Sequence, residues 1–395
     1  MHRASARALA ALVLALSTTA LSATALGASV GSGSGDTTDF YAVPDPLPKA
    51  LPGSLIRAAS IDAPDGAKAW RVLYHSTTVD GRDIAVSGVV VAPEGPPPKG
   101  GRPVLSWAHG TTGIADACAP SMDPEVASRL PFVEDFLDAG YVIAATDYEG
   151  LGTPGVHPYL VGESEGRGVL DAARAARRLD GTGAGRELLV FGHSQGGHAA
   201  LFAGELKADY APELRLRGVV AGAPAANVEI IFPGAARVPR AAGFTALIAK
   251  GFEAAYPDAD PASLLSPEVL AAAQVADTGC ALDVIDAVGK VGSTDLVGDV
   301  ASTPPWPDIL RENSAGHRAA GAPLLVVQGT ADQVVPAALT DAWVGQACAA
   351  GDVVEYRSYE GKDHITVLGE ARAGILEWLA TLAQGDAVRD TCPTP

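Results

Sequence analysis

Ser194 stands in a local pattern that makes a serine nucleophilic. It is the centre of a G-x-S-x-G pattern at residues 192–196, which follows a short apolar run at 188–191 and precedes a predicted helix at 197–210. A serine at such a strand–turn–helix junction takes a strained backbone conformation, and only small residues fit two positions before and after it. Glycines occupy both of those positions. Ser194 is therefore the predicted nucleophile of an acyl-transfer site.

Asp332 and His364 are predicted to be the acid and the base that activate this serine. They follow the predicted strands 323–328 and 353–358, the last two of the chain. Folds with this serine turn place the groups in the chain order serine, acid, histidine. His364 is the only histidine after Asp332, so it must be the base if Asp332 is the acid. Three other aspartates compete for the acid role, of which the last is adjacent to the base and badly placed to bond it: Asp341, Asp352 and Asp363.

Two backbone N–H groups are predicted to hold the negative charge that develops on the carbonyl oxygen. One belongs to Gln195, because the helix after the nucleophile aims its first N–H groups at the reacting centre. The other belongs to Thr111, or less favourably to Thr112, in the loop after the predicted strand 104–108. His109 begins that loop and is predicted to be a buried histidine whose ring braces it.

A second G-x-S-x-G pattern occurs at residues 162–166, centred on Ser164. A proline interrupts the segment before it, and two carboxylates flank the serine, where they would repel a developing oxyanion. Ser164 is better explained as the N-cap of a helix predicted at 165–179. Two histidines lie on either side of Ser194, His193 within the first pattern and His198 just after it, and both are predicted to be structural.

The chain also matches G-x-G-x-x-G at residues 150–155, after a predicted strand. Prolines at 154 and 158 prevent a helix from starting there, so no dinucleotide site is predicted. Tyr148, just before this loop, either lines an acyl pocket or is structural. The chain has no H-E-x-x-H pattern and no clustered Cys and His residues, and neither a metal nor a cofactor is expected.

The elements that must position these residues alternate between strands and helices, which predicts an α/β fold with a mostly parallel central sheet. Roughly 100 residues separate the strands predicted at 216–223 and 323–328, far more than a connection in such a fold needs. Residues 224–320 are therefore predicted to be an inserted helical cap, with helices at 241–255, 267–276 and 282–288. Residues 29–223 and 321–395 form the predicted core. The other predicted strands are 70–76, 84–92, 104–108, 141–146 and 188–191, and the other core helices are 131–139 and 372–382.

Residues 1–28 are predicted to be a secretory signal peptide, with a basic start, an apolar centre and small residues before the cleavage site. No later stretch is long and apolar enough to predict a membrane span. The net charge of −18 argues against nucleic acid and anionic membrane surfaces as partners and is compatible with an uncharged substrate. Four cysteines in an exported chain predict two disulfides, for which the sequence allows three pairings. They are Cys118, Cys280, Cys348 and Cys392.

Five stretches taken together resemble the secretory lipases, a group typified by fungal lipase A with many actinobacterial members. They are W-A-H-G-T-T-G at 107–113, D-Y-E-G-L-G at 147–152, G-H-S-Q-G-G-H at 192–198, P-P-W-P-D-I-L-R-E-N-S at 304–314 and G-T-A-D-Q-V-V-P at 329–336. The resemblance runs from about residue 45 to residue 392. It implies an α/β-hydrolase fold with a helical cap and activity on carboxylic esters, including triacylglycerols.

The same resemblance implies a triad of Ser194, Asp332 and His364, and it favours the disulfides Cys118–Cys280 and Cys348–Cys392. Thr111 departs from the fungal relative, where an aspartate supplies that oxyanion N–H, but a backbone donor does not depend on its side chain. We therefore expect a secreted, monomeric ester hydrolase and most favour a lipase. The alternatives are a short-chain or polyester esterase, an acyltransferase, or a non-catalytic binding protein on the same fold.

Overall fold

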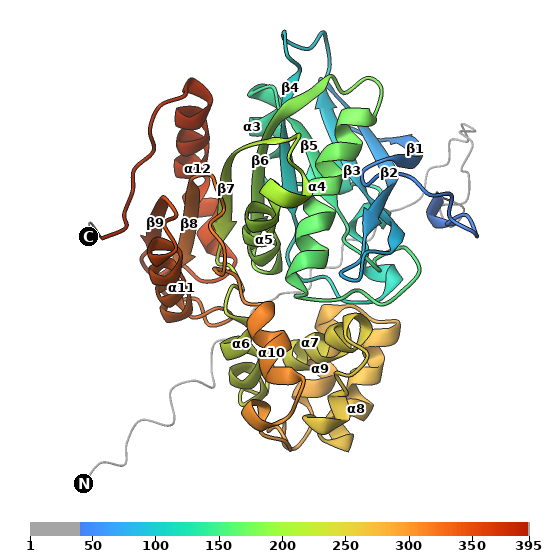
Figure 1. Cartoon of the computed structure of the whole chain (residues 1–395), viewed down its shortest axis with the longest axis vertical. Helices are drawn as coiled ribbons and strands as arrows, with labels where there is room; N and C mark the ends of the chain where they lie inside the picture. Colours follow the sequence, from blue (N-terminus) through green and yellow to red (C-terminus); the bar gives the residue numbers. More distant parts are fainter. Residues whose placement is uncertain (1–39, 394–395) are drawn as a thin grey trace, which may run out of the picture. The chain divides into compact units, whose positions relative to one another are not determined.

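The fold is described from a computed structural model, which covers residues 40–393 (Figure 1). The predicted signal peptide lies outside these described residues. A nine-stranded sheet forms the centre, with the strand order β1-β2-β3-β5-β4-β6-β7-β8-β9. The strands are β1 (Leu55–Ile61), β2 (Ala67–Thr77), β3 (Asp83–Pro93), β4 (Arg102–Ala108), β5 (Val142–Thr146), β6 (Ala184–His193), β7 (Arg215–Gly222), β8 (Leu324–Gly329) and β9 (Val354–Tyr359).

The sheet is mostly parallel, as the alternation of elements predicted. The first three pairings, from β1 to β5, are antiparallel. All pairings from β5 through β4 to β9 are parallel. The edge strand β1 was not predicted, because none of its seven residues is fully buried and it carries no continuous apolar signal.

Helices cover both faces of the sheet. One face packs against α4 (Gly162–Arg178), α5 (Gln195–Tyr210) and α11 (Ala337–Ala349), and the other against α2 (Val126–Arg129), α3 (Val133–Asp138) and α12 (Thr366–Gln384). The apolar runs of β4 and β6 are buried between these two layers. Strands buried on both faces read as continuous apolar stretches, which is why the sequence located them.

The connection from β7 to β8 contains five α-helices and three short 3₁₀ helices, which share an apolar core. The α-helices are α6 (Val228–Ala236), α7 (Ala242–Ala255), α8 (Pro267–Ala273), α9 (Ala281–Gly289) and α10 (Trp306–Glu312). Phe232, Phe252 and Trp306 stack inside this helical insertion. It lies beyond the ends of β6 and β7, next to the turn that begins α5 (Figure 1). The sequence missed α6 and α10, both of which contain a proline: Pro233 lies inside α6 and Pro307 in the first turn of α10.

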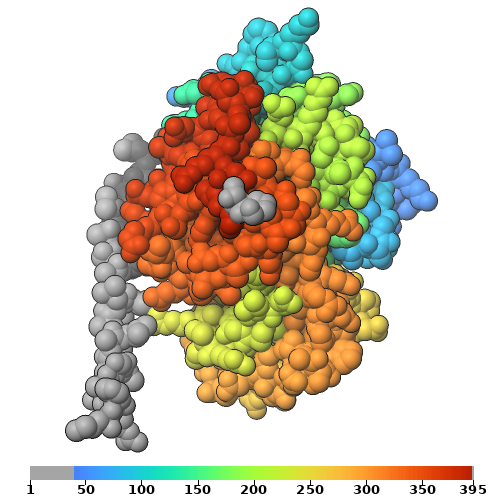
Figure 2. Space-filling model, turned by 60° about the vertical axis from the view of Figure 1, so that its left-hand side comes forward, coloured from blue at the N-terminus to red at the C-terminus, as the bar shows by residue number. Residues whose placement is uncertain are grey.

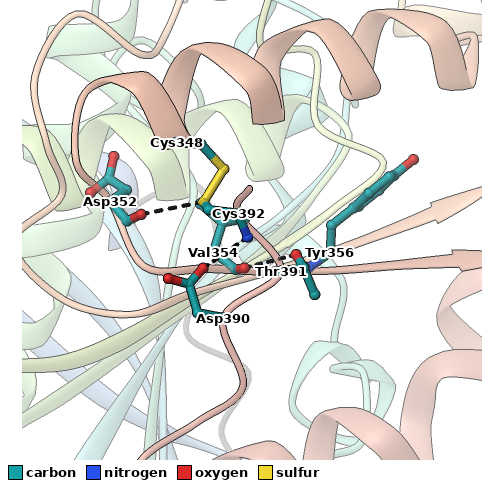
Figure 3. Close-up of a disulfide and its surroundings, with 7 residues drawn as sticks. All are labelled: Cys348, Asp352, Val354, Tyr356, Asp390, Thr391 and Cys392. Atoms are coloured by element: carbon teal, nitrogen blue, oxygen red, sulfur yellow. Dashed lines mark hydrogen bonds between the residues drawn. A yellow bond between two sulfur atoms is a disulfide. The ribbon is translucent and has the colours of Figure 1, made fainter. Parts of the chain in front are cut away.

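Two disulfides tie loops to this framework. Cys118, after β4, is bonded to Cys280 at the start of α9, and Cys348, near the end of α11, is bonded to Cys392 in the C-terminal tail. Figure 3 shows the second bond, beside which Thr391 pairs with the backbone of Val354. These are the pairs that the family resemblance favours. In the space-filling view, the C-terminal elements and the insertion form adjoining parts of one face (Figure 2).

Candidate active site

Ser194 lies at the turn between β6 and α5, in the strained conformation that its pattern predicts. Its backbone has φ 60° and ψ −119°, a region that non-glycine residues rarely occupy. A Cβ atom added to Gly192 would lie 1.9 Å from the Gly196 oxygen, and one added to Gly196 would lie 1.9 Å from the Ala108 oxygen. The close approach of three backbone segments therefore requires both glycines.

The structure brings Asp332, His364 and Ser194 into one hydrogen-bonded chain. His364 Nε2 lies 2.9 Å from Ser194 Oγ, and His364 Nδ1 lies 2.7 Å from Asp332 Oδ2. These separations suit transfer of the serine proton to the imidazole while the carboxylate fixes the ring. Two of the competing aspartates are engaged elsewhere, since Asp352 accepts the Ala320 N–H and Asp363 accepts bonds from the start of α12.

Asp332 is held as an acceptor on both of its oxygens. Oδ1 accepts the N–H groups of Val334 and Val335, and Oδ2 accepts Gln328 Nε2 as well as the His364 ring. Burial pushes the pKa of Asp332 upward, but the hydrogen bonds from His364, Val335 and Val334 outweigh it and lower the pKa. The carboxylate is therefore ionised at neutral pH and can orient the imidazole.

The two predicted oxyanion donors lie on segments that approach the serine from different sides. Gln195 is the first residue of α5, whereas Thr111 follows Gly110, where an added Cβ would lie 3.7 Å from Ser194 Cβ. Among the described residues, neither the Gln195 nor the Thr111 backbone N–H has a protein acceptor. Both remain available for an oxygen bound at the serine.

The insertion and a neighbouring loop hold the Thr111 segment in place. Thr111 Oγ1 lies 2.7 Å from the Tyr159 hydroxyl, and the Thr112 carbonyl accepts the Ala281 N–H of α9 at 2.8 Å. The Cys118–Cys280 disulfide lies at the same junction. The position of this donor loop therefore depends on residues that the sequence assigned to the insertion.

The other aromatic groups near the site brace it from within the protein. His109 lies 2.6 Å from the Gly110 oxygen through Nδ1, and its ring packs on that of Tyr148. Tyr148 is fully buried and donates to the His109 carbonyl, so it has the structural role that the sequence left open.

His193 contacts His364, the predicted base, which the sequence did not show. Its Nε2 lies 2.8 Å from the carbonyl oxygen of His364, so this nitrogen carries the proton and donates. Burial and the nearby His364 lower the pKa of His193 to about 4, which keeps its ring neutral near pH 7. The two residues are 171 positions apart, and no local signal links them.

The prediction that Ser164 caps a helix was wrong. Helix α4 begins at Gly162, with Val161 as its N-cap, so Ser164 lies inside the first turn. Its hydroxyl donates to Glu149 Oε2 at 2.5 Å instead of to a free N–H of the helix. The helix begins earlier than predicted because Asn313 of the insertion accepts the Gly162 N–H and replaces a serine cap.

Between residues 40 and 393, no helix is long and apolar enough to cross a membrane. No group of three or more His, Cys, Asp or Glu side chains in that range could hold a metal ion.

The chain is similar in sequence and in fold to known proteins. The profile of the family described as "Secretory lipase" matches residues 124–390. The chain is 24% identical over 385 residues to a Mycobacterium tuberculosis protein named a probable inactive lipase. This alignment covers 90% of this chain and 85% of the relative. It is 23% identical over 386 residues to lipase A of Moesziomyces aphidis, with 90% and 82% covered. The crystal structure of Candida antarctica lipase A aligns with a TM-score of 0.74 at 20% identity, covering 90% and 88%, and shares the fold.

Proposed function

The chain belongs to the secretory lipase family, and on that premise we propose that it is a secreted serine hydrolase of carboxylic esters that acts as a triacylglycerol lipase. The observation that carries the proposal is the unbroken chain of hydrogen bonds from Ser194 through His364 to Asp332. A protein that had lost catalysis on this fold would be expected to have lost one of these groups or to have a blocked serine turn.

In the proposed reaction, His364 removes the proton of Ser194 Oγ while that oxygen attacks the ester carbonyl. The backbone N–H groups of Gln195 and Thr111 hold the oxyanion, a contribution of roughly 3–4 kcal/mol per donor in comparable sites. Asp332 stabilises the imidazolium, which then gives its proton to the departing alcohol. Water, activated by the same histidine, attacks the acyl-enzyme and releases the acid.

The helical insertion is the proposed cap over the substrate, spanning residues 224–320. Its helices bury an apolar core that continues to Ile114, next to the Thr111 loop, and to Val335, close to Asp332. The insertion therefore meets the loops beside the serine through apolar side chains, surroundings that suit an acyl chain better than a charged group. We therefore expect mid-length and longer acyl esters to be substrates.

Export is part of the proposal. The residues predicted to form the signal peptide would direct secretion, and the two disulfides fit an oxidising compartment. Because a similar chain carries the name of an inactive lipase, a non-catalytic protein on the same fold is the alternative to test.

A series of p-nitrophenyl esters from acetate to palmitate, with emulsified triglyceride beside it, tests the function. The proposal expects turnover that extends to mid-length or longer chains, together with covalent labelling of Ser194 by an alkyl phosphonate. Strict preference for acetate would contradict the lipase and favour a small-ester esterase. No turnover and no labelling of correctly folded protein would support the non-catalytic alternative.

A further inference from the structure

The second G-x-S-x-G pattern lies directly behind the first. It forms the first turn of α4, which packs against α5, the helix that begins after Ser194. A Cβ atom added to Gly162 would lie 2.3 Å from the ring of Phe202, and one added to Gly166 would lie 3.0 Å from the backbone nitrogen of Ala203. The glycines of the second pattern thus let the two helices approach closely. Glu165, which follows the serine of that pattern, reaches the residue after Ser194.

Glu165 is fully buried, and both of its carboxylate oxygens have hydrogen-bond partners. Its Oε1 accepts the Leu160 N–H at 2.9 Å and Gln195 Nε2 at 2.8 Å. Its Oε2 lies 2.8 Å from Nδ1 of His198. The residue that follows the serine in one pattern is therefore bonded to the residue that follows the serine in the other.

A neighbouring histidine fixes the orientation of the Gln195 side chain. Nδ1 of His157 lies 2.8 Å from the Glu149 carbonyl and must donate to it. Burial lowers the pKa of His157 to about 4, so the ring is neutral and its Nε2 can only accept. Gln195 Nε2 lies 2.8 Å from that atom and supplies the proton. Both partners of the Gln195 amide are therefore acceptors.

We propose that Glu165 is a positioning residue for the oxyanion site, which acts by anchoring the side chain of Gln195 and so the backbone N–H at the start of α5. This inference rests on the proposed function. The Gln195 Oε1 atom is buried and has no partner among residues 40–393, so the two bonds of Nε2 are the anchor. These two bonds hold the Gln195 side chain against His157 and Glu165 and so restrain the peptide that follows Ser194.

A small displacement of that peptide has a large effect because the donor acts on the transition state. A reacting group that moves by about 1 Å can lose about 100-fold in rate. An interaction made only in the transition state changes kcat and leaves KM unaltered. Loss of the anchor is therefore expected to lower kcat by about 10- to 100-fold, with KM within about threefold of the wild-type value.

Three substitutions separate position from charge. Gln195→Met and Glu165→Met each remove one side of the anchor at similar side-chain length, and both should show the fall in kcat. Glu165→Gln keeps a carbonyl for Leu160 and Gln195 and turns its amide to His198. The His198 ring can accept that amide because its other nitrogen donates to the Asn313 carbonyl. Glu165→Gln should therefore stay within about threefold of the wild-type kcat.

Asp171→Asn is the matched control. Asp171 is a second fully buried carboxylate of α4, but it bonds to Ser76, Arg174 and Tyr210, away from the serine turn. Its replacement should lower stability and leave kcat unchanged. Folded Gln195→Met with an unchanged kcat, or a loss confined to KM, would overturn the proposal. The proposal would also be overturned if kcat fell as far in Glu165→Gln as in Glu165→Met. If Glu165→Met does not fold, Gln195→Met and Glu165→Gln still decide the matter.

A second readout does not depend on turnover. The backbone amide resonance of Gln195 should move in Glu165→Met and remain in place in Asp171→Asn. An unmoved resonance in Glu165→Met would contradict the anchoring role. Absence of ester hydrolysis in the wild type, with the resonance shifted as expected, would instead count against the proposed function alone.

Discussion

The two G-x-S-x-G patterns share their fixed residues and fold differently. Ser194 sits between a buried strand and a helix, with a positive φ and its hydroxyl at the His364 ring. Ser164 lies in the first turn of α4 with its hydroxyl bonded to Glu149. In the first pattern the glycines allow the backbone to pass close to itself, and in the second they allow one helix to pack on another.

The difference shows that the two glycines of the pattern only allow other parts of the chain to come close. The elements before and after the pattern decide whether a nucleophile turn or a helix contact results. A strand before the serine produces the turn that exposes a nucleophile. A proline-containing loop before the serine leads instead into a helix whose first turn is buried. The two patterns are nevertheless in contact through Gln195 and Glu165, so the second supports the first.

The largest expected difference between the patterns concerns activity. Ser194→Ala should reduce kcat by at least about 10,000-fold, because removal of a nucleophile leaves only the oxyanion site and binding. Ser164→Ala should retain kcat within about twofold. Ester hydrolysis by both purified variants checks this, and the opposite result would mean that the nucleophile is misassigned.

The glycines give the next largest difference. Gly196→Ala would place a Cβ 1.9 Å from a backbone oxygen that cannot move aside, so a loss above about 4 kcal/mol or failure to fold is expected. Gly166→Ala meets its neighbours at 3.0 Å, and overpacking should cost about 1–3 kcal/mol, offset in part by the better helix propensity of alanine. Urea denaturation measures both. Equal losses would show that the two close approaches are equally rigid.

His193, beside Ser194, and Glu149, beside Ser164, should change the free energy of unfolding in opposite directions as the pH falls. The pKa of His193 is about 4 in the folded protein against about 6.5 when unfolded. The unfolded state therefore binds more protons below pH 6.5, and this residue should remove roughly 3 kcal/mol of stability between pH 6.5 and pH 4. Burial raises the pKa of Glu149, the partner of Ser164. The folded protein therefore binds this proton more tightly than the unfolded chain, and the free energy of unfolding falls as the pH rises through the range in which Glu149 ionises.

Denaturant titrations at several pH values test these signs. The variant His193→Gln should lose part of the acid-induced destabilisation, and Glu149→Gln should lose the opposing contribution. If the free energy of unfolding of His193→Gln depended on pH as steeply as that of the wild type, protonation of the His193 ring would not be a cause of the acid-induced destabilisation.

The smallest expected effect is the change in stability of Ser164→Ala. Without a capping role, the variant loses one hydrogen bond to a half-buried carboxyl group, which should cost about 1–2 kcal/mol. Thermal or urea unfolding measures the loss, and far-UV circular dichroism should show an unchanged helix content. Fraying of α4 in this variant would restore the capping interpretation.

Much of the fold was predictable because its signals are local. The apolar runs of the parallel strands and the helices between them identified the α/β class, and the long connection before β8 marked the insertion. Helix α11 was not predicted, since its sequence is rich in alanine and Trp343 is its only large buried side chain. Helix α6 was missed because proline inside a helix is normally a sign of its end. Helix α10 is only seven residues long and has no capping side chain to mark its start, since Pro305 is its N-cap.

The sequence by itself determined the candidates for the triad, because the serine turn is a local geometry and the order of the elements restricts the acid and the base. Only the tertiary structure decided what surrounds them. Glu165 reaches Gln195 across 30 residues and His193 reaches His364 across 171, and both contacts exist because separate helices and loops pack at one end of the sheet. In the sequence, a carboxylate beside a serine argues against a functional role. In the structure, packing removes water from Glu165 and surrounds it with three hydrogen-bond partners, Leu160, Gln195 and His198.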